Sequence, residues 1–128
     1  MTIRIVQLGS ARLRGEGVRL GTVRRPPRGV PRTRFASDDW FDVWLPNLAP
    51  SQELMSAGRS STSPKSWKSF AGRYEAEMNR PDASRVLDVL AALSHSANFS
   101  VGCYCADETQ CHRSLLRELL ACRGAKIV

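Results

Sequence analysis

The sequence has no apolar run near the roughly 20 residues needed to cross a bilayer, and its first residues, MTIRIV, contain no apolar core of a signal peptide. These absences predict a cytoplasmic protein that does not enter a membrane. Internal repeats and low-complexity segments are missing as well. With 42% hydrophobic and 24% charged residues, the 128-residue chain has the composition of one ordinary globular domain, expected over 1–128.

Lysine is missing from the first 34 residues, which nevertheless carry all of the excess of positive over negative charge in the chain. Nine arginines stand there against one acid, Glu16, giving a net charge of +8, while the remaining residues sum to −1 and the whole chain to +7. Arginine presents a planar fork of donors that suits bidentate contacts with phosphate or carboxylate. The segment is therefore either a solvated basic surface or a patch that faces an anionic partner, with nucleic acid as one alternative.

Apolar periodicity predicts an α/β fold. Alternating β-branched residues indicate strands at 2–8, 18–23 and 99–105, with shorter ones at 41–45 and 125–128. Serine caps and first-turn prolines indicate helices beginning at Ser51, Ser63-Pro64 and Pro81, with a last helix over 115–122 and a flexible Ser/Thr/Gly stretch at 58–63. This order predicts a single layered α/β domain with a mostly parallel sheet flanked by helices.

The segment from Cys103 to Ser114 is the strongest candidate site, since it runs from a strand through a polar loop into a helix. Ligands of open α/β sheets bind at the carboxyl ends of the strands. Thr109 is the expected N-cap, which places Cys111, His112 and Arg113 in the first helical turn. The helix dipole and Arg113 would stabilise an anion there.

Thiol chemistry is a second possibility at the same segment. A helix N-terminus and neighbouring cations favour the thiolate and would lower the pKa of Cys111. Cysteines of a cytoplasmic protein are more often buried, reactive or metal-binding than paired in disulfides. Cys105 and Cys111 are separated by five residues across the loop and could approach closely enough to resolve one another.

Three further interpretations apply to this segment. The Cys-x5-Arg cradle of low-molecular-weight tyrosine phosphatases and rhodaneses is not present, since seven residues separate Cys105 from Arg113. A metal site made by Cys103, Cys105, Cys111 and His112 is disfavoured, because residues two apart on a strand are awkward ligands for one tetrahedral zinc. Alternatively, the cysteines are small buried hydrophobes and the histidine and arginine only cap and pair within the fold.

Four segments carry a family resemblance: Pro27-Arg28-Gly29, LAPSQEL at 48–54, WKSFAGRY at 67–74, and CHRS at 111–114. Together they resemble the bacterial domain-of-unknown-function 488 family, DUF488, in its YeaO-like branch. The resemblance implies a compact α/β fold with a site built from the Pro-Arg-Gly loop and the Cys-His-Arg turn. The sequence VRRPPRG at 23–29 lacks the acid and tryptophan of the branch pattern, and some members keep the histidine without the cysteine, which favours His112 and the arginines as the shared element.

The leading hypothesis is a small anionic or phosphorylated ligand bound between the loop 24–28 and the start of the last helix. Arg28 and Arg113 would clamp the anion, His112 would shuttle a proton, and Glu108 would orient a partner. The expected ligand-binding residues are Arg24, Arg28, Arg113, Ser114 and Cys105; the expected catalytic residues are Cys111, His112 and Glu108. The alternatives are a thiol-dependent enzyme with Cys111 as nucleophile, or nucleic-acid binding through the N-terminal arginines. No metal or cofactor is expected, and the oligomeric state stays open.

Overall fold

A four-stranded parallel sheet forms the centre of the protein. The computed structural model describes residues 1–59 and 63–128, and its strands run in the order β1-β4-β2-β3. The strands are β1 (Ile3–Gln7), β2 (Val18–Gly21), β3 (Val43–Trp44) and β4 (Phe99–Cys103). Every pairing in this order is parallel, which confirms the predicted α/β fold with a parallel sheet.

Four α-helices and three short 3-10 helices join the strands in the described part of the chain. The α-helices are α1 (Gln52–Arg59), α2 (Pro64–Met78), α3 (Pro81–Leu93) and α4 (His112–Cys122), and the 3-10 helices are η1 (Arg32–Arg34), η2 (Pro46–Leu48) and η3 (Glu108–Gln110). None of the helices in the described ranges has the length and apolarity that a bilayer span requires.

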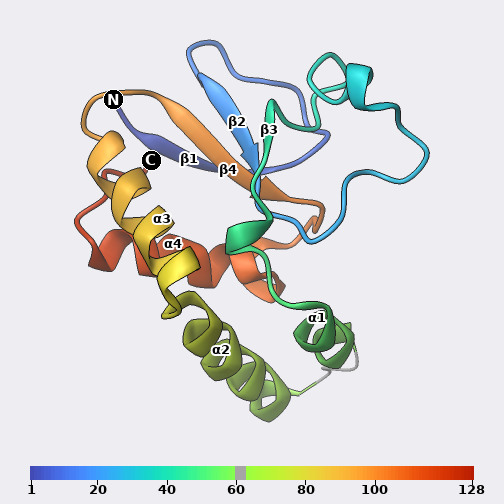
Figure 1. The fold of residues 1–128 in the computed structure, drawn as a ribbon, viewed down its shortest axis with the longest axis vertical. Helices are drawn as coiled ribbons and strands as arrows, with labels where there is room; N and C mark the ends of the chain where they lie inside the picture. Colours follow the sequence, from blue (N-terminus) through green and yellow to red (C-terminus); the bar gives the residue numbers. More distant parts are fainter. Residues whose placement is uncertain (60–62) are drawn as a thin grey trace.

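The helices gather on one face of the sheet (Figure 1). The strand register puts Ile3, Phe99 and Val101 on that face, where they join the main core with apolar residues of all four helices. Tyr74 of α2 is fully buried in this core and donates its hydroxyl to the carbonyl of Leu48 at 2.7 Å. Trp67, Phe70 and Tyr74 of α2 recur at helical spacing, which predicts a buried face; Phe70 and Tyr74 belong to the core, and Trp67 packs against it.

Loops cover the opposite face of the sheet. Arg19 of β2 is fully buried there and forms an ion pair with the buried Glu16 at 2.8 Å. Ser100 of β4 donates to the same carboxylate at 2.7 Å. Phe41 packs where a side chain on Gly21 would stand, so the glycine lets the loop lie directly on the strand. This face therefore carries a polar network and Phe41, which belongs to a small second core with Leu8, Val23, Cys103 and Cys111.

Local signals predict the helix starts well. Ser63 accepts a hydrogen bond from the amide of Ser66 ahead of α2, and Ser51 accepts one from the amide of Leu54 in α1. The predicted strand at the C-terminus is reduced to one bridge between Ile3 and Ile127, which brings the two termini together (Figure 1). Part of the stretch 58–63, predicted as flexible, lies outside the described residues, and α1 extends over its first two positions.

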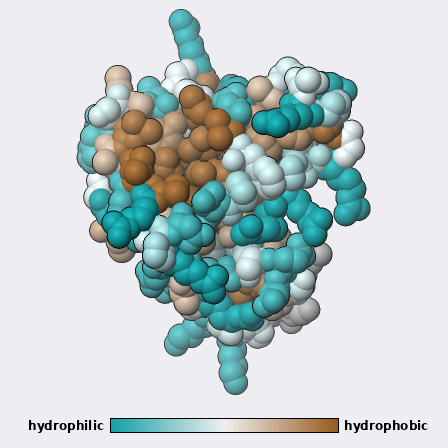
Figure 2. All heavy atoms as spheres, viewed as in Figure 1, coloured by the Kyte–Doolittle hydropathy of each residue, from teal (hydrophilic) through white to brown (hydrophobic). Residues whose placement is uncertain are grey.

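The surface divides into two regions. In the orientation of Figure 1, apolar side chains gather over the sheet, whereas hydrophilic ones cover the end that holds α1 and α2 (Figure 2). Val18 of β2 and Val43 of β3 are each about half exposed at 47% and 48%, because the helices do not extend over this edge of the sheet.

Candidate functional site

A cleft of about 830 Å³ opens at the carboxyl ends of β1, β2 and β4. This is the end of a parallel sheet at which ligands are expected. The lining combines the strand ends, the arginine-rich loop after β2, the start of α4 and aromatic residues from loops and α2. The lining residues are Gln7, Leu8, Val23, Arg24, Arg25, Pro26, Pro27, Arg28, Trp40, Gln52, Met55, Trp67, Phe70, Cys103, Tyr104, Cys105, Cys111 and His112.

Helix α4 begins at the floor of this cleft. Its N-cap is Cys111, with extended backbone at φ −125 and ψ 151. The predicted cap at Thr109 is wrong, because Asp107 caps a separate 3-10 turn by accepting from the amide of Thr109. Cys111 is thus the residue before the first helical turn, next to free N–H groups at the positive end of the dipole.

His112 has a defined orientation and protonation state. Its Nε2 lies 2.8 Å from the carbonyl oxygen of Thr22 and must be the donor, since a carbonyl only accepts. Burial lowers the pKa of His112 to about 4, against the opposing effect of the bond to Thr22. The ring is therefore neutral at pH 7, and the lone pair of Nδ1 faces Cys111 Sγ at 3.7 Å.

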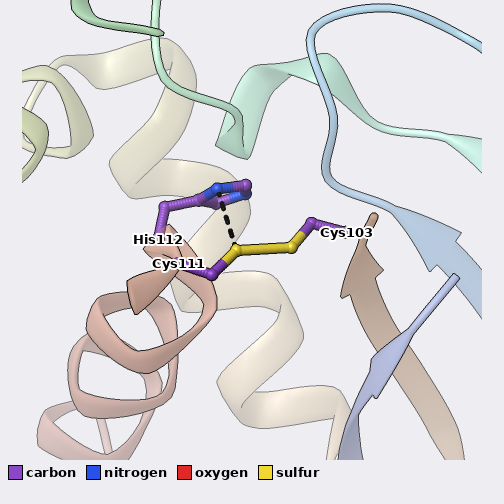
Figure 3. Close-up of side chains that lie close together, drawn as sticks. All are labelled: Cys103, Cys111 and His112. Atoms are coloured by element: carbon purple, nitrogen blue, oxygen red, sulfur yellow. Dashed lines mark hydrogen bonds between the residues drawn. A yellow bond between two sulfur atoms is a disulfide. The ribbon is translucent and has the colours of Figure 1, made fainter. Parts of the chain in front are cut away.

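Cys103 completes a buried cluster with these two residues. It ends β4, and the structure joins its sulfur to that of Cys111 as a disulfide beside the ring of His112 (Figure 3). The expected approach of Cys105 to Cys111 is therefore wrong. Strand β4 ends at Cys103, and Cys105 beyond it is an exposed free thiol. The expectation of unpaired cysteines is corrected for this one pair.

Arg113 lies buried behind the start of α4, with only 3% of its surface exposed. One of its terminal nitrogens, Nη2, donates to the carbonyl of Cys105, and its buried Nε has no hydrogen-bond partner among the described residues. Burial lowers the pKa of this guanidinium, while nearby acids such as Glu108 oppose that effect. The structure thus keeps a cation out of solvent without an ion pair in the described ranges, an arrangement that is unfavourable in free energy.

The arginine loop forms the opposite wall of the cleft. Arg24 donates to the carbonyls of Pro46, Ala49 and Pro50, so it holds the segment before α1 in place. Arg28 is exposed on the cleft lining. The cleft therefore brings the loop 24–28 and the Cys111-His112 turn together across 80 or more residues of sequence, whereas Arg113 stands behind the lining.

Other predicted site residues have local partners. Glu108 forms a salt bridge with Arg117 at 2.8 Å, which is the main cause of its lowered pKa and gives it a role in holding η3 against α4. Ser114 donates its hydroxyl to the carbonyl of Cys111 at 3.0 Å, within the first turn. Neither residue lines the cleft.

The N-terminal arginines do not form one free basic face. Arg19 is paired with Glu16, Arg12 donates to Asp42, and Arg34 pairs with Asp38. Because these cations are engaged within the fold, fewer are available to a polyanion than the sequence count suggests.

The expected ligand-binding and catalytic residues do not include Trp40, nor Cys103 and Tyr104, although these last two lie within the predicted segment 103–114. Trp40 and Tyr104 line the cleft with their rings 5.9 Å apart, one from a loop and one from just beyond β4. Cys103 carried a usable signal, because it is the last residue of a buried strand and so stands at the sheet edge where the helix start must also lie.

Comparison with known proteins identifies one family. A family model described as "Active DUF488-N3 subclade" matches residues 3–124. No curated protein and no solved structure matches the chain.

Proposed function

The chain belongs to the DUF488 family, and from its cleft we propose that it binds a small anionic, phosphate-bearing molecule with an apolar body. The observation that carries this proposal is the cleft itself, with arginines on one wall and the start of α4 on the other. The family model is described as an active subclade, which is in keeping with a site for a small molecule.

Positive charge on two sides of the cleft supports an anionic ligand. Arg25 and Arg28 are exposed on the loop wall. On the other side, the free N–H groups of α4 point away from the helix toward its start, where an anion is stabilised. The buried guanidinium of Arg113 adds a full charge behind this point, and an anion nearby would offset the cost of its desolvation.

The rest of the lining supports an apolar or aromatic body. Trp67 and Phe70 of α2 lie stacked with their ring centroids 5.3 Å apart, and both line the cleft with Trp40 and Tyr104. Ligand sites of small molecules combine a mostly apolar wall with a few polar groups that fix orientation. The loop arginines and the Cys111-His112 turn are those polar groups.

The test compares phenyl phosphate with inorganic phosphate on the reduced protein, read by tryptophan fluorescence and calorimetry. A hydrogen bond to a charged group contributes about 1.5–3 kcal/mol, so Arg28→Ala should weaken phenyl phosphate binding by about tenfold or more. Arg14→Ala, at an exposed arginine outside the cleft lining, is the matched control and should leave the affinity unchanged.

Equal losses in both variants, with a steep dependence on salt, would instead indicate nonspecific attraction of polyanions and favour nucleic acid as partner. Binding unaffected by Arg28→Ala would contradict the proposed ligand site.

Thiol chemistry at Cys111 is the second candidate, favoured by the approach of His112 Nδ1 to its sulfur at 3.7 Å. A nucleophile within reach of a neutral base whose other nitrogen is held by a third group is the usual arrangement of an activated thiol. Cys111 is buried, whereas Cys105 and Cys122 are exposed. If Cys111 of the reduced protein is alkylated fastest despite its burial, and His112→Asn slows it by about a hundredfold or more, the thiol mechanism gains over simple binding.

A further inference from the structure

Three soft or borderline ligand atoms meet at the floor of the cleft. The sulfurs of Cys103 and Cys111 and a ring nitrogen of His112 all lie within 4.8 Å of one another, and all three residues are buried. Cys103 comes from the end of β4, and the other two from the start of α4 (Figure 3). Thiolate and imidazole together are the donor set preferred by zinc.

The spacing between sulfur and nitrogen fits a shared metal ion. With Zn–S near 2.3 Å and Zn–N near 2.05 Å, two ligands at a tetrahedral angle stand about 3.6 Å apart. Cys111 Sγ and His112 Nδ1 are 3.7 Å apart. Nδ1 is the free nitrogen, since Nε2 donates to the carbonyl of Thr22. A ligating histidine that donates its other N–H to a backbone carbonyl is the usual outer-shell arrangement of zinc sites.

The backbone separation also favours an ion between the sulfurs over a permanent disulfide. The Cα atoms of Cys103 and Cys111 are 8.0 Å apart, whereas disulfides usually join Cα atoms roughly 4.4–6.8 Å apart. Two cysteines that ligate one metal are held farther apart, because two metal–sulfur bonds replace one sulfur–sulfur bond.

We propose that Cys103, Cys111 and His112 Nδ1 of the reduced protein bind one Zn²⁺, with its fourth coordination position open to the cleft. Reduction by a phosphine breaks the sulfur–sulfur bond: the phosphine gives up two electrons and leaves as the phosphine oxide, while water supplies its oxygen and the protons of the two thiols. Zinc then replaces the two thiol protons, which are released to solvent. Three protein ligands with one open position are typical of zinc sites that act on a substrate, whereas structural sites are closed by four.

The site differs from the metal set that the sequence suggests. Cys105 is exposed beyond the end of β4 and is not part of the cluster. The site therefore does not use Cys103 and Cys105, two residues apart on one strand, as joint ligands. One ligand, Cys103, comes from β4, and the other two, Cys111 and His112, come from the start of α4. The proposed zinc site does not depend on the proposed anionic ligand. Only one further step rests on the proposed function, namely that an oxygen of such a ligand occupies the open coordination position.

Cobalt substitution tests the site directly. The full chain, reduced with a phosphine and kept free of oxygen, is titrated with Co²⁺ and then with Zn²⁺. We expect one equivalent of Co²⁺ to give thiolate-to-cobalt charge-transfer and tetrahedral d–d bands, which Zn²⁺ then abolishes. Cys103→Ser and Cys111→Ser should each weaken binding by at least roughly a hundredfold, while Cys105→Ser and Cys122→Ser, the matched controls, should leave it unchanged.

A second measurement needs no variant. Zn²⁺ should protect Cys103 and Cys111 from alkylation in the native protein, while Cys105 and Cys122 continue to react, as read by mass spectrometry. Absence of the charge-transfer bands, bands that persist in Cys103→Ser, or equal alkylation of all four cysteines with and without Zn²⁺ would each overturn the metal site. None of these outcomes bears on phosphate binding, because that is measured on the reduced protein without added metal and is read from Arg28→Ala.

Discussion

Nε2 of His112 donates to the carbonyl oxygen of Thr22 over 2.8 Å, and this bond ties the start of α4 to the end of β2 across 90 residues of sequence. The carbonyl of Thr22 comes directly before Val23 and Arg24, where the arginine loop starts. The bond therefore determines which ring nitrogen of His112 faces Cys111. It also fixes the position at which the arginine loop leaves the sheet. The two walls of the cleft are fixed relative to one another at this point.

Replacing Arg113 with methionine should separate stability from binding. A buried charge without an ion pair costs free energy, and apolar replacements of such groups are often neutral or stabilising. We expect Arg113→Met to keep or raise the melting temperature while phenyl phosphate binding weakens, because the variant removes the positive charge behind the start of α4.

The matched control for that prediction is Arg19→Met. Arg19 is equally buried but is paired with Glu16. Its loss leaves an uncompensated buried carboxylate and should cost about 3–5 kcal/mol of unfolding free energy. Comparable destabilisation of both variants in urea would show that Arg113 is a structural residue.

The aromatic wall of the cleft should distinguish ligands by their apolar part. Stacking on an aromatic ring contributes about 0.5–1.5 kcal/mol beyond area burial, so Trp67→Leu should weaken phenyl phosphate roughly two- to tenfold. Inorganic phosphate has no ring and should bind the variant as it binds the native protein. Calorimetry with both ligands checks this, and an equal loss for the two would place the ligand elsewhere in the cleft.

Lowering the pH should reduce the unfolding free energy by a defined amount, because Glu16 becomes protonated. Burial by itself would raise the pKa of Glu16, but hydrogen bonds from Arg19, Ser100 and the amide of Leu13 lower it to about 2, from 4.5. A depressed carboxyl pKa contributes stability that is complete above 4.5 and is lost as the pH falls from 4.5 toward 2. The contribution is about 3 kcal/mol, because each tenfold difference in proton affinity between the folded and unfolded states corresponds to roughly 1.4 kcal/mol.

Urea unfolding of the native protein and Glu16→Gln at pH 7, 5, 4 and 3 measures this contribution. The difference between the two proteins should be largest at pH 7 and shrink steadily below pH 4.5. A difference that stays constant with pH would mean that the carboxylate is not ionised against Arg19 in the folded state.

Two glycines with similar backbone angles should respond very differently to alanine. Gly15 and Gly17 have φ of +79 and +81, so both substitutions carry the cost of a left-handed residue, about 1–2 kcal/mol. A Cβ on Gly15 meets open space, whereas one on Gly17 collides with the carbonyl of Asn98, next to β4. Gly17→Ala should therefore lower the unfolding free energy by at least about 1–3 kcal/mol more than Gly15→Ala. Chemical denaturation of both variants checks this, and equal losses would show that the Asn98 loop moves aside freely.

Local chemistry made much of the fold predictable. Ser63 before Pro64 marks the start of α2, and alternation around Ile3 and Phe99 marks the neighbouring strands β1 and β4, because caps and side-chain periodicity act within a few residues. The same reasoning failed at Thr109. Asp107 competes for the amide of Thr109 and closes a 3-10 turn, which moves the start of α4 to Cys111.

The candidate site was only partly predictable for a related reason. The sequence predicted a site between the loop 24–28 and the turn 111–113, and the structure places the loop and Cys111-His112 on one cleft. It also buries Arg113 behind that cleft and gives Glu108 a different partner, Arg117. Whether a charged side chain faces a ligand or a neighbouring helix depends on packing that no local pattern encodes.

By itself, the sequence determined the parallel α/β layout, the helix starts at Ser51, Ser63 and Pro81, and the cluster of chemistry after the strand at 99–103. Only the tertiary structure decided that Cys103, and not Cys105, meets Cys111. Side chains alternate between the two faces of a sheet only as far as the strand pairs with its neighbour. Strand β4 ends at Cys103, so the sheet holds Cys103 in place, whereas the loop sets the direction of Cys105. The bond between His112 and Thr22 was likewise decided in three dimensions, because it joins a side chain to a backbone carbonyl 90 residues away.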